Sequence, residues 1–278
     1  MVKDSALINA SYRLDLVEQR LILLAIVEAR EQAIKSFSGD LCIHAETYIK
    51  QFGVTRQAAY ISLKEACDSL FERQFSYKKI TPKNNVEIVK SRWVQRISYV
   101  ENEARVALRF ADDVIPFITQ LEKQFTSYEL SQISNLSSVY AVPLYELLIA
   151  WRSVEKTPIW EIEDLRLKLG LLENEYMRTD NLKRFVLDLA IKQINEHTDS
   201  SAEYEQHKQG RTITGFSFTF TQKSLTKKPD AAKRGCKPKV SSKVATPSEM
   251  NVPALPPKAR KKPDRSATDM LKTVLEKQ

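Results

Sequence analysis

Residues 45–71 read AETYIKQFGVTRQAAYISLKEACDSLF, which predicts two helices joined by a short turn. Gly53 ends the first helix, because glycine readily adopts the left-handed conformation that closes a helix. Thr55 caps the second helix, since its hydroxyl can accept a hydrogen bond from a free backbone N–H of the first turn. Apolar residues recur every three or four positions along this second helix, which gives it one buried face. A helix, a glycine-containing turn and a capped helix indicate a helix-turn-helix unit.

A β-hairpin follows this unit. Residues 89–99 alternate between two faces, Glu101-Asn102-Glu103 forms a turn, and residues 105–110 alternate in the returning strand. Because side chains in a strand point to opposite faces in turn, we expect residues 89–99 to form one long strand. A hairpin in this place is a wing, so the unit is predicted to be a winged-helix domain. The outward face of the wing carries five basic residues: Lys90, Arg92, Arg96, Arg105 and Arg109.

The following residues repeat this order of elements. A helix over 161–169 ends at Gly170, Thr179-Asp180 cap a helix over 181–197, and a hairpin turns at Gln209-Gly210. The turn glycines align at an offset of 117 and the next helices at 119, so the second turn is two residues longer. We predict an α+β protein with two tandem winged-helix domains, at residues 1–125 and 126–222. Two unrelated α+β domains with the same helical period are the alternative.

The alignment also assigns a buried face to the helix at 181–197. Phe185 and Leu189 align with Ala66 and Leu70, which belong to the buried face of the first unit. Leu187 and Ile191 then fall on the opposite side of the helix. Either another element covers them, or they meet thymine methyl groups.

In a helix-turn-helix protein, the second helix enters the major groove and its first residues meet base edges. In the first domain this helix turns carboxylates outward, including Glu65 and Asp68, which phosphates repel. Only Arg56 and Gln57 at its start suit DNA. We therefore expect the first domain to supply phosphate contacts, mainly through its wing.

The second domain has a different set of side chains at this place. Its helix start and wing carry six candidate DNA-binding residues: Arg178, Asn181, Lys183, Arg184, Lys208 and Arg211. Arginine can bond guanine and asparagine can bond adenine through paired hydrogen bonds. A single basic residue is more commonly a solvated surface charge, but the cluster at a helix start favours DNA. We predict that the second domain reads the DNA sequence.

The whole chain has a net charge of +8, and its positive excess lies in the last part. Residues 223–278 hold 15 of the 43 lysines and arginines, 5 of the 35 acidic residues, 7 of the 11 prolines and no aromatic residue. Such a segment cannot bury enough apolar surface to offset the entropy of ordering, so we expect a disordered basic tail. It either attracts phosphates without regard to sequence or is a solubilising linker. Its last residues, 266–278, form either a short amphipathic helix for a partner or a fraying stub.

Composition argues against several classes of protein. The chain has no apolar run of membrane-spanning length, no secretory signal at its start and only three scattered cysteines, so we expect a cytoplasmic protein without membrane contact. A metal-binding histidine pair is not expected, because His44, His197 and His207 are far apart in the sequence. Asp112-Asp113 is the only adjacent aspartate pair, and neighbouring residues of a helix do not face the same way, so we expect no carboxylate pair for metal ions there. No Gly-Lys-Ser/Thr phosphate loop occurs. We therefore expect no enzyme, no metal and no cofactor.

Several segments resemble iteron-binding plasmid replication initiators of the RepE/pi type, and in particular RepM-like initiators. The likeness begins with SALINASYRL at residues 5–14 and EQRLI at 18–22. It returns in the second domain, with LKRFV at 182–186, QIN at 193–195, YE at 204–205 and KQGR at 208–211. The family often carries Glu where this chain has Gln193, so no site role is transferred to that residue.

The resemblance implies double-stranded DNA as the partner, in a bacterial cytoplasm. Monomers of such initiators bind directly repeated origin sequences, called iterons, and help to open an adjacent AT-rich segment. Dimers formed mainly through the first domain repress the initiator's own promoter or pair origins, and host initiator and replicative helicase are recruited. The alternative is a transcriptional repressor with tandem winged helices, which would bind inverted repeats as a dimer.

Overall fold

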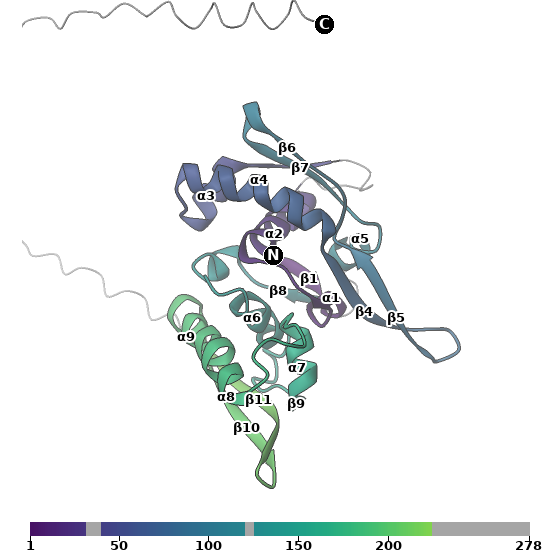
Figure 1. Cartoon of the computed structure of the whole chain (residues 1–278), viewed down its shortest axis with the longest axis vertical. Coiled ribbons are helices and arrows are strands. Elements are labelled where there is room, and N and C mark those ends of the chain that lie inside the picture. The colour runs from purple at the N-terminus through teal and green to yellow at the C-terminus, as the bar shows by residue number, and fades with distance from the viewer. Residues whose placement is uncertain (32–39, 120–124, 224–278) are drawn as a thin grey trace, which may run out of the picture. The chain divides into compact units, whose positions relative to one another are not determined.

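The computed structural model describes residues 1–31, 40–119 and 125–223 (Figure 1). The predicted basic tail therefore lies outside the described residues, except for Lys223. The chain begins with β1 (Val2–Asp4), α1 (Ser5–Ile8), β2 (Ser11–Tyr12) and α2 (Leu16–Glu31). Two reciprocal hydrogen bonds cap α2. The Glu18 N–H donates to the Asp15 carboxylate at 2.9 Å, and the Asp15 N–H donates to the Glu18 carboxylate at 2.7 Å.

The predicted helix-turn-helix unit is present in the first domain. It consists of β3 (Leu41–His44), α3 (Ala45–Phe52) and α4 (Arg56–Glu72). Gly53 ends α3 with a φ of 63°, and the Thr55 hydroxyl accepts the Ala58 N–H at 3.3 Å. The buried face of α4 is the one that its periodicity predicts, with Ala59, Leu63, Ala66, Cys67 and Leu70.

The predicted single strand over 89–99 is wrong, because the chain breaks at Trp93. Trp93 and its neighbour Val94 are both buried, whereas neighbours in a continuous strand face opposite sides. β5 (Val86–Arg92) pairs with β4 (Gln74–Ile80), which the sequence pattern did not predict, in a sheet of order β2-β4-β5. β6 (Val94–Val100) pairs with β7 (Arg105–Phe110) in a sheet of order β3-β7-β6. The five basic residues assigned to one wing face therefore belong to two sheets.

The second winged-helix unit follows a short connecting region. This region holds α5 (Ile115–Thr119) and β8 (Phe125–Ser127), which pairs with β1. The unit then contains α6 (Ala141–Ile149), β9 (Trp160–Glu161), α7 (Ile162–Lys168), β10 (Ser200–Gln209) and β11 (Thr212–Gln222). The hairpin turns at Gly210, as predicted, and joins β9 in a sheet of order β10-β11-β9.

The second recognition helix contains a π-turn. α8 (Thr179–Leu182), the π-turn Lys183–Leu187 and α9 (Asp188–His197) follow one another without a gap. A π-turn holds one residue more than an α-turn, so it rotates later residues by about 100° around the helix axis. The predicted burial of Phe185 and Leu189 is therefore wrong, since they are 45% and 42% exposed. Leu187 is buried instead, and Ile191 packs partly against the same core.

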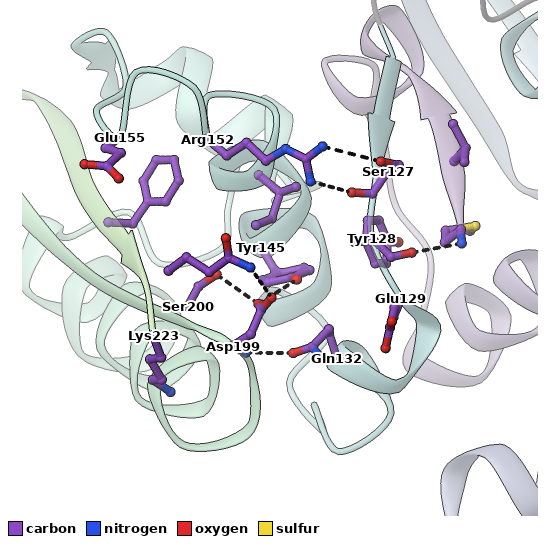
Figure 2. Close-up of a pocket in the computed structure, with 15 residues that line it drawn as sticks. Ser127, Tyr128, Glu129, Gln132, Tyr145, Arg152, Glu155, Asp199, Ser200 and Lys223 are labelled. Carbon is purple, nitrogen blue, oxygen red and sulfur yellow. Dashed lines mark hydrogen bonds between the residues drawn. The ribbon is translucent and has the colours of Figure 1, made fainter. Parts of the chain in front are cut away.

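A cavity of 690 Å³ lies beside β1, β8 and α6 (Figure 2). Its polar side chains bond to groups that line it. Arg152 donates to the Ser127 carbonyl at 3.1 Å, and the Asp199 N–H donates to Gln132 Oε1 at 2.7 Å. Internal hydrogen bonds therefore hold these lining groups in place.

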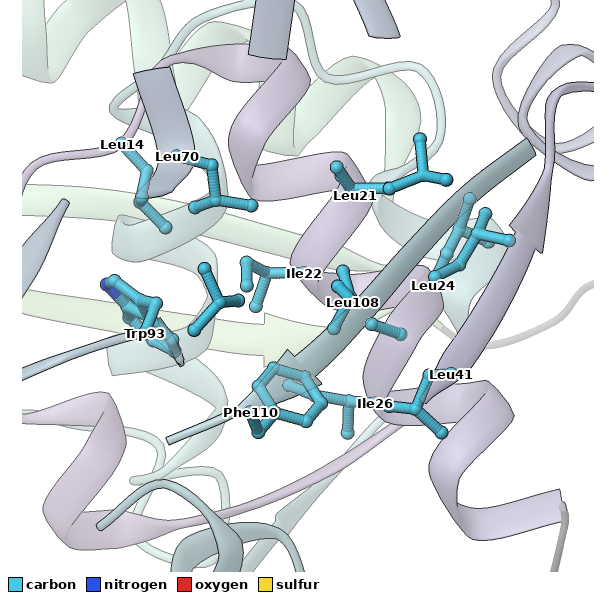
Figure 3. Packing of buried hydrophobic residues seen from close by; sticks show 14 of the residues in the cluster. Leu14, Leu21, Ile22, Leu24, Ile26, Leu41, Leu70, Trp93, Leu108 and Phe110 are labelled. Carbon is cyan, nitrogen blue, oxygen red and sulfur yellow. The ribbon is translucent and has the colours of Figure 1, made fainter. Parts of the chain in front are cut away.

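The buried apolar residues form two clusters. The first gathers around α2, where Leu21, Ile22 and Ile26 pack with Leu108 and Phe110 of β7 (Figure 3). The second gathers around α6 and includes α9 and the phenylalanines of β11. Each helix-turn-helix unit thus rests on a core of its own, which holds its recognition helix in place.

Candidate nucleic-acid interface

A buried arginine holds the turn before the second recognition helix. Arg166 of α7 is 5% exposed, although it carries a positive charge. Its guanidinium donates hydrogen bonds of 2.7–3.3 Å to four backbone carbonyls of this turn, those of Leu172, Glu173, Glu175 and Tyr176. Tyr176 has a φ of 44°, in a region that residues other than glycine rarely adopt. Arg166 therefore fixes a longer and more strained turn than the one at Gly53.

The start of α8 carries exposed polar and basic side chains. Arg178 stands at the position before the first helical residue, so the predicted cap at Thr179-Asp180 is wrong, and Arg178 makes no side-chain cap hydrogen bond. Its guanidinium lies 3.8 Å from the Asp180 carboxylate, and both side chains are about four-fifths exposed. Asn181 is also exposed. This end of the helix leaves its side chains available to a ligand.

Two basic residues of the π-turn point in different directions. Arg184 is exposed, and its guanidinium carbon lies 5.3 Å from the centroid of the Phe185 ring. Lys183 is half-buried and donates to Gln206 Oε1 of β10 at 3.2 Å. Arg184 is therefore turned outward, while Lys183 links the recognition helix to the wing.

The second wing presents two basic residues at its tip. Lys208 and Arg211 flank Gly210, and both are exposed. Neither forms an ion pair within residues 1–31, 40–119 and 125–223. Figure 1 shows the β10–β11 hairpin projecting from the second domain. Unpaired cations on such a hairpin are suited to phosphate contacts.

In the first domain, most of the basic residues that were predicted to bind DNA pair with acidic groups of the same domain. Arg96 and Arg109 both pair with Asp40, at 2.6 and 2.9 Å, and Arg105 pairs with Glu103. Arg92 donates to the Phe71 carbonyl at 2.6 Å and to Glu72 at 3.1 Å. Within the described chain only Lys90 of this group lacks such a partner, and it is exposed.

The start of α4 is also less available than its sequence indicates. Arg56 Nε donates to the Tyr60 hydroxyl at 2.7 Å, and its guanidinium stacks over that ring. Gln57 is exposed beside it, but Glu65 and Asp68 are exposed further along the helix. Among the predicted DNA-binding residues of the described chain, Arg184, Lys208 and Arg211 of the second domain are therefore exposed without an ion pair, whereas the arginines of the first domain are bound to other groups of that domain.

Sequence reasoning missed three residues near the second recognition helix. Phe185 and Leu189 lie on its exposed side, and Arg166 supports the preceding turn. The two-residue lengthening of that turn was a signal that it needs support of its own. Nothing in the periodicity marks the π-turn, because the pattern fits an unbroken α-helix equally well.

The described residues also lack two kinds of feature. They contain no group of three or more His, Cys, Asp or Glu side chains that could hold a metal ion. Among the helices of this part of the chain, none is long and apolar enough to cross a membrane.

Two winged-helix units in tandem, with exposed cations at a recognition helix and a wing, define a protein of the DNA-binding winged-helix class. A sequence model described as "Initiator Replication protein, WH1" matches residues 1–149. One described as "Initiator Rep protein, WH2" matches residues 161–220. The chain therefore belongs to the initiator replication protein family of plasmids. This confirms the predicted family and the two winged-helix domains, while the predicted boundary at residues 125 and 126 stays a prediction.

Individual proteins are also similar to this chain. The PI protein of Escherichia coli is 28% identical over 207 residues, which cover 64% of this chain and 68% of that protein. An uncharacterized 27.6 kDa protein of Escherichia coli is 25% identical over 223 residues, which cover 76% and 91%. The crystal structure of Pi initiator protein in complex with iteron DNA is similar with a TM-score of 0.61 and 23% identity, covering 81% of this chain and 97% of that one. At this identity the structural likeness is one of fold.

Proposed function

We propose that this protein initiates plasmid replication by binding directly repeated origin sequences as a monomer. The second domain reads the repeat, and the first adds phosphate contacts. The bound protein promotes opening of the origin and recruits host initiator and replicative helicase. As a dimer it represses its own promoter.

One observation carries this proposal: three candidate cations of the second domain form no ion pair in the described residues, whereas four of the five candidate cations of the first wing are paired with carboxylates. Arg184, Lys208 and Arg211 are exposed and form no ion pair in the described chain. When these cations contact DNA phosphates, counterions are released from the DNA. No ion pair within the protein has to be broken for these three residues to do so. The likeness to a protein crystallised with iteron DNA supports repeated origin sites as the target.

The first domain offers a surface for the proposed dimer. β5 lies at the edge of its sheet and has one neighbouring strand within the described residues. Ile80 of β4 pairs with Val86, so both share a face with Ile88, and these three side chains are 59–66% exposed. An open edge strand with an apolar face favours pairing with a second copy. This surface supports a monomer–dimer equilibrium that leaves the second domain free.

The decisive test is a footprint and gel-shift titration on the DNA that flanks the gene, at two salt concentrations, with the oligomeric state measured in parallel. Stepwise occupation of direct repeats by monomers is the expected result. Binding only as a dimer to an inverted repeat would instead assign the protein to transcriptional repression. A plasmid that replicates from this origin without the protein would overturn the initiator function.

A further inference from the structure

Two apolar side chains lie among the polar residues of the second recognition helix. Phe185 and Leu189 are one helical turn apart and are 45% and 42% exposed. Their counterparts in the first recognition helix, Ala66 and Leu70, are 3% and 0% exposed. The π-turn causes this difference, because it moves Leu187 and Ala190 onto the core and turns Phe185 and Leu189 away from it.

The neighbours of this pair suit nucleic acid. Asn181 and Arg184 precede it on the exposed stripe of the helix, and Lys192, which lies 3.9 Å from the Glu196 carboxylate, follows it. The nearby carboxylates are each engaged. Asp180 lies 3.8 Å from Arg178, and Asp188 accepts the Tyr204 hydroxyl at 2.6 Å. Each of these two carboxylates therefore has a partner within the second domain.

The size of the apolar pair also argues against a protein partner. A stable protein interface buries about 800 Å² on each side, which two half-exposed side chains flanked by Arg184 and Lys192 do not provide. In the major groove, however, the one apolar group on a base edge is the 5-methyl group of thymine. A pair of apolar side chains between base-reading polar residues is complementary to that group.

We propose that Phe185 and Leu189 are specificity-determining residues that recognise thymine through its 5-methyl group. This inference rests on the proposed function, since it requires that the second domain binds a specific DNA sequence. Phe185 and Leu189 select thymine over cytosine at one or two positions of the repeat. Asn181 and Arg184 read neighbouring bases by hydrogen bonds.

The test uses the full chain and the repeat found by footprinting. Each thymine of the repeat is replaced singly by deoxyuridine, which keeps every hydrogen-bonding group and removes only the methyl group. We expect the affinity to fall about fourfold at one or two positions, as for the loss of one buried methyl group. Phe185→Ala or Leu189→Ala should bind the thymine and deoxyuridine sites equally at the matching position.

The matched control is Ile61→Ala, because Ile61 is a 53% exposed apolar residue on the recognition helix of the first domain. This variant should keep the full sensitivity to deoxyuridine. Specific binding that is indifferent to deoxyuridine at every position would overturn the inference and leave the proposed function intact. Absence of specific binding at either salt concentration would overturn both.

Discussion

In the first helix-turn-helix unit a short turn at Gly53 leads into a regular helix that exposes Glu65. In the second unit a longer turn, held by the buried Arg166, leads into a helix with a π-turn that exposes Arg184. Both units use the same order of elements. The difference lies in how each turn is supported and in which side chains the recognition helix exposes.

The difference extends to the wings. Arg96 and Arg109 of the first wing share Asp40, whereas Lys208 and Arg211 of the second have no ion-pair partner in the described residues. A cation that already has a carboxylate beside it gains less from a phosphate, because the internal pair must be weakened. The number of basic residues in a domain is therefore a poor guide to DNA binding. Whether those residues are already paired with carboxylates of the same domain is a better guide.

The largest expected effect comes from replacing the turn glycines. Gly170 has a φ of 71°, and a Cβ atom there would lie 2.2 Å from the backbone oxygen of Tyr12. Gly53 has a φ of 63° but no atom within 4 Å of such a Cβ. Gly170→Ala should lower the free energy of unfolding by roughly 2–4 kcal/mol, since it combines left-handed strain with overpacking. Urea unfolding of the full chain measures this loss.

Gly53→Ala is the matched control, because it carries the backbone strain alone. It should cost about 1 kcal/mol. Equal losses for the two variants would show that the second turn has room to relax, and the contrast between a braced and an open turn would fail.

The next effect concerns the bases. At the offset of 119 residues Arg184 corresponds to Glu65, and both side chains are exposed. Arg184→Ala should cost about 1–3 kcal/mol of specific binding and relax discrimination at one base pair. Glu65→Ala should change specific binding by less than about 0.5 kcal/mol. Titrations against single-base variants of the site measure both. An unchanged base preference in Arg184→Ala would remove this residue from the reading surface.

Local signals in the sequence predicted both helix-turn-helix units. Gly53, Thr55 and the spacing of Ala59 and Leu63 each act within a few residues, so the elements that depend on them are where the pattern put them. The break at Trp93 and the π-turn at Lys183–Leu187 depend on how distant parts of the chain pack. Nothing in the local pattern distinguishes them from a long strand and a regular helix.

The candidate site was predictable to a similar degree. The residue types at the start of α8 were visible in the sequence, but the pairing of Arg96 with Asp40 joins residues 56 positions apart. The exposure of Phe185 follows from the π-turn and was therefore out of reach. Charge can be read from a sequence, while the availability of that charge requires the structure.

A smaller effect should appear in the salt dependence of binding. Arg211→Ala should weaken binding to all sequences alike and reduce the slope of log affinity against log salt by about one. Arg92→Ala should reduce the slope by less, because Arg92 is bound to Glu72 and the Phe71 carbonyl. Nonspecific duplex DNA at several salt concentrations measures the two slopes. A larger change for Arg92 than for Arg211 would reverse the assignment of the two wings.

The smallest effect is a pH dependence of the second turn. Hydrogen bonding to Arg13, at 2.7 Å, holds the pKa of Glu175 below its ordinary value of 4.5. A carboxyl whose pKa is lowered by folding stabilises the protein above its unfolded pKa, and that stabilisation is lost as the pH falls through the lowered value. The wild type should therefore lose more stability than Glu175→Gln between about pH 5 and 3, by less than about 1 kcal/mol for this partly exposed pair.

Glu173→Gln, in the same turn, is the control, because the Glu173 carboxylate forms no ion pair within the described residues. Urea unfolding across this pH range measures the difference. Identical pH profiles for the wild type and Glu175→Gln would mean that the bond between Arg13 and Glu175 does not stabilise this turn, which would then depend on the hydrogen bonds of Arg166 and the close packing of Gly170.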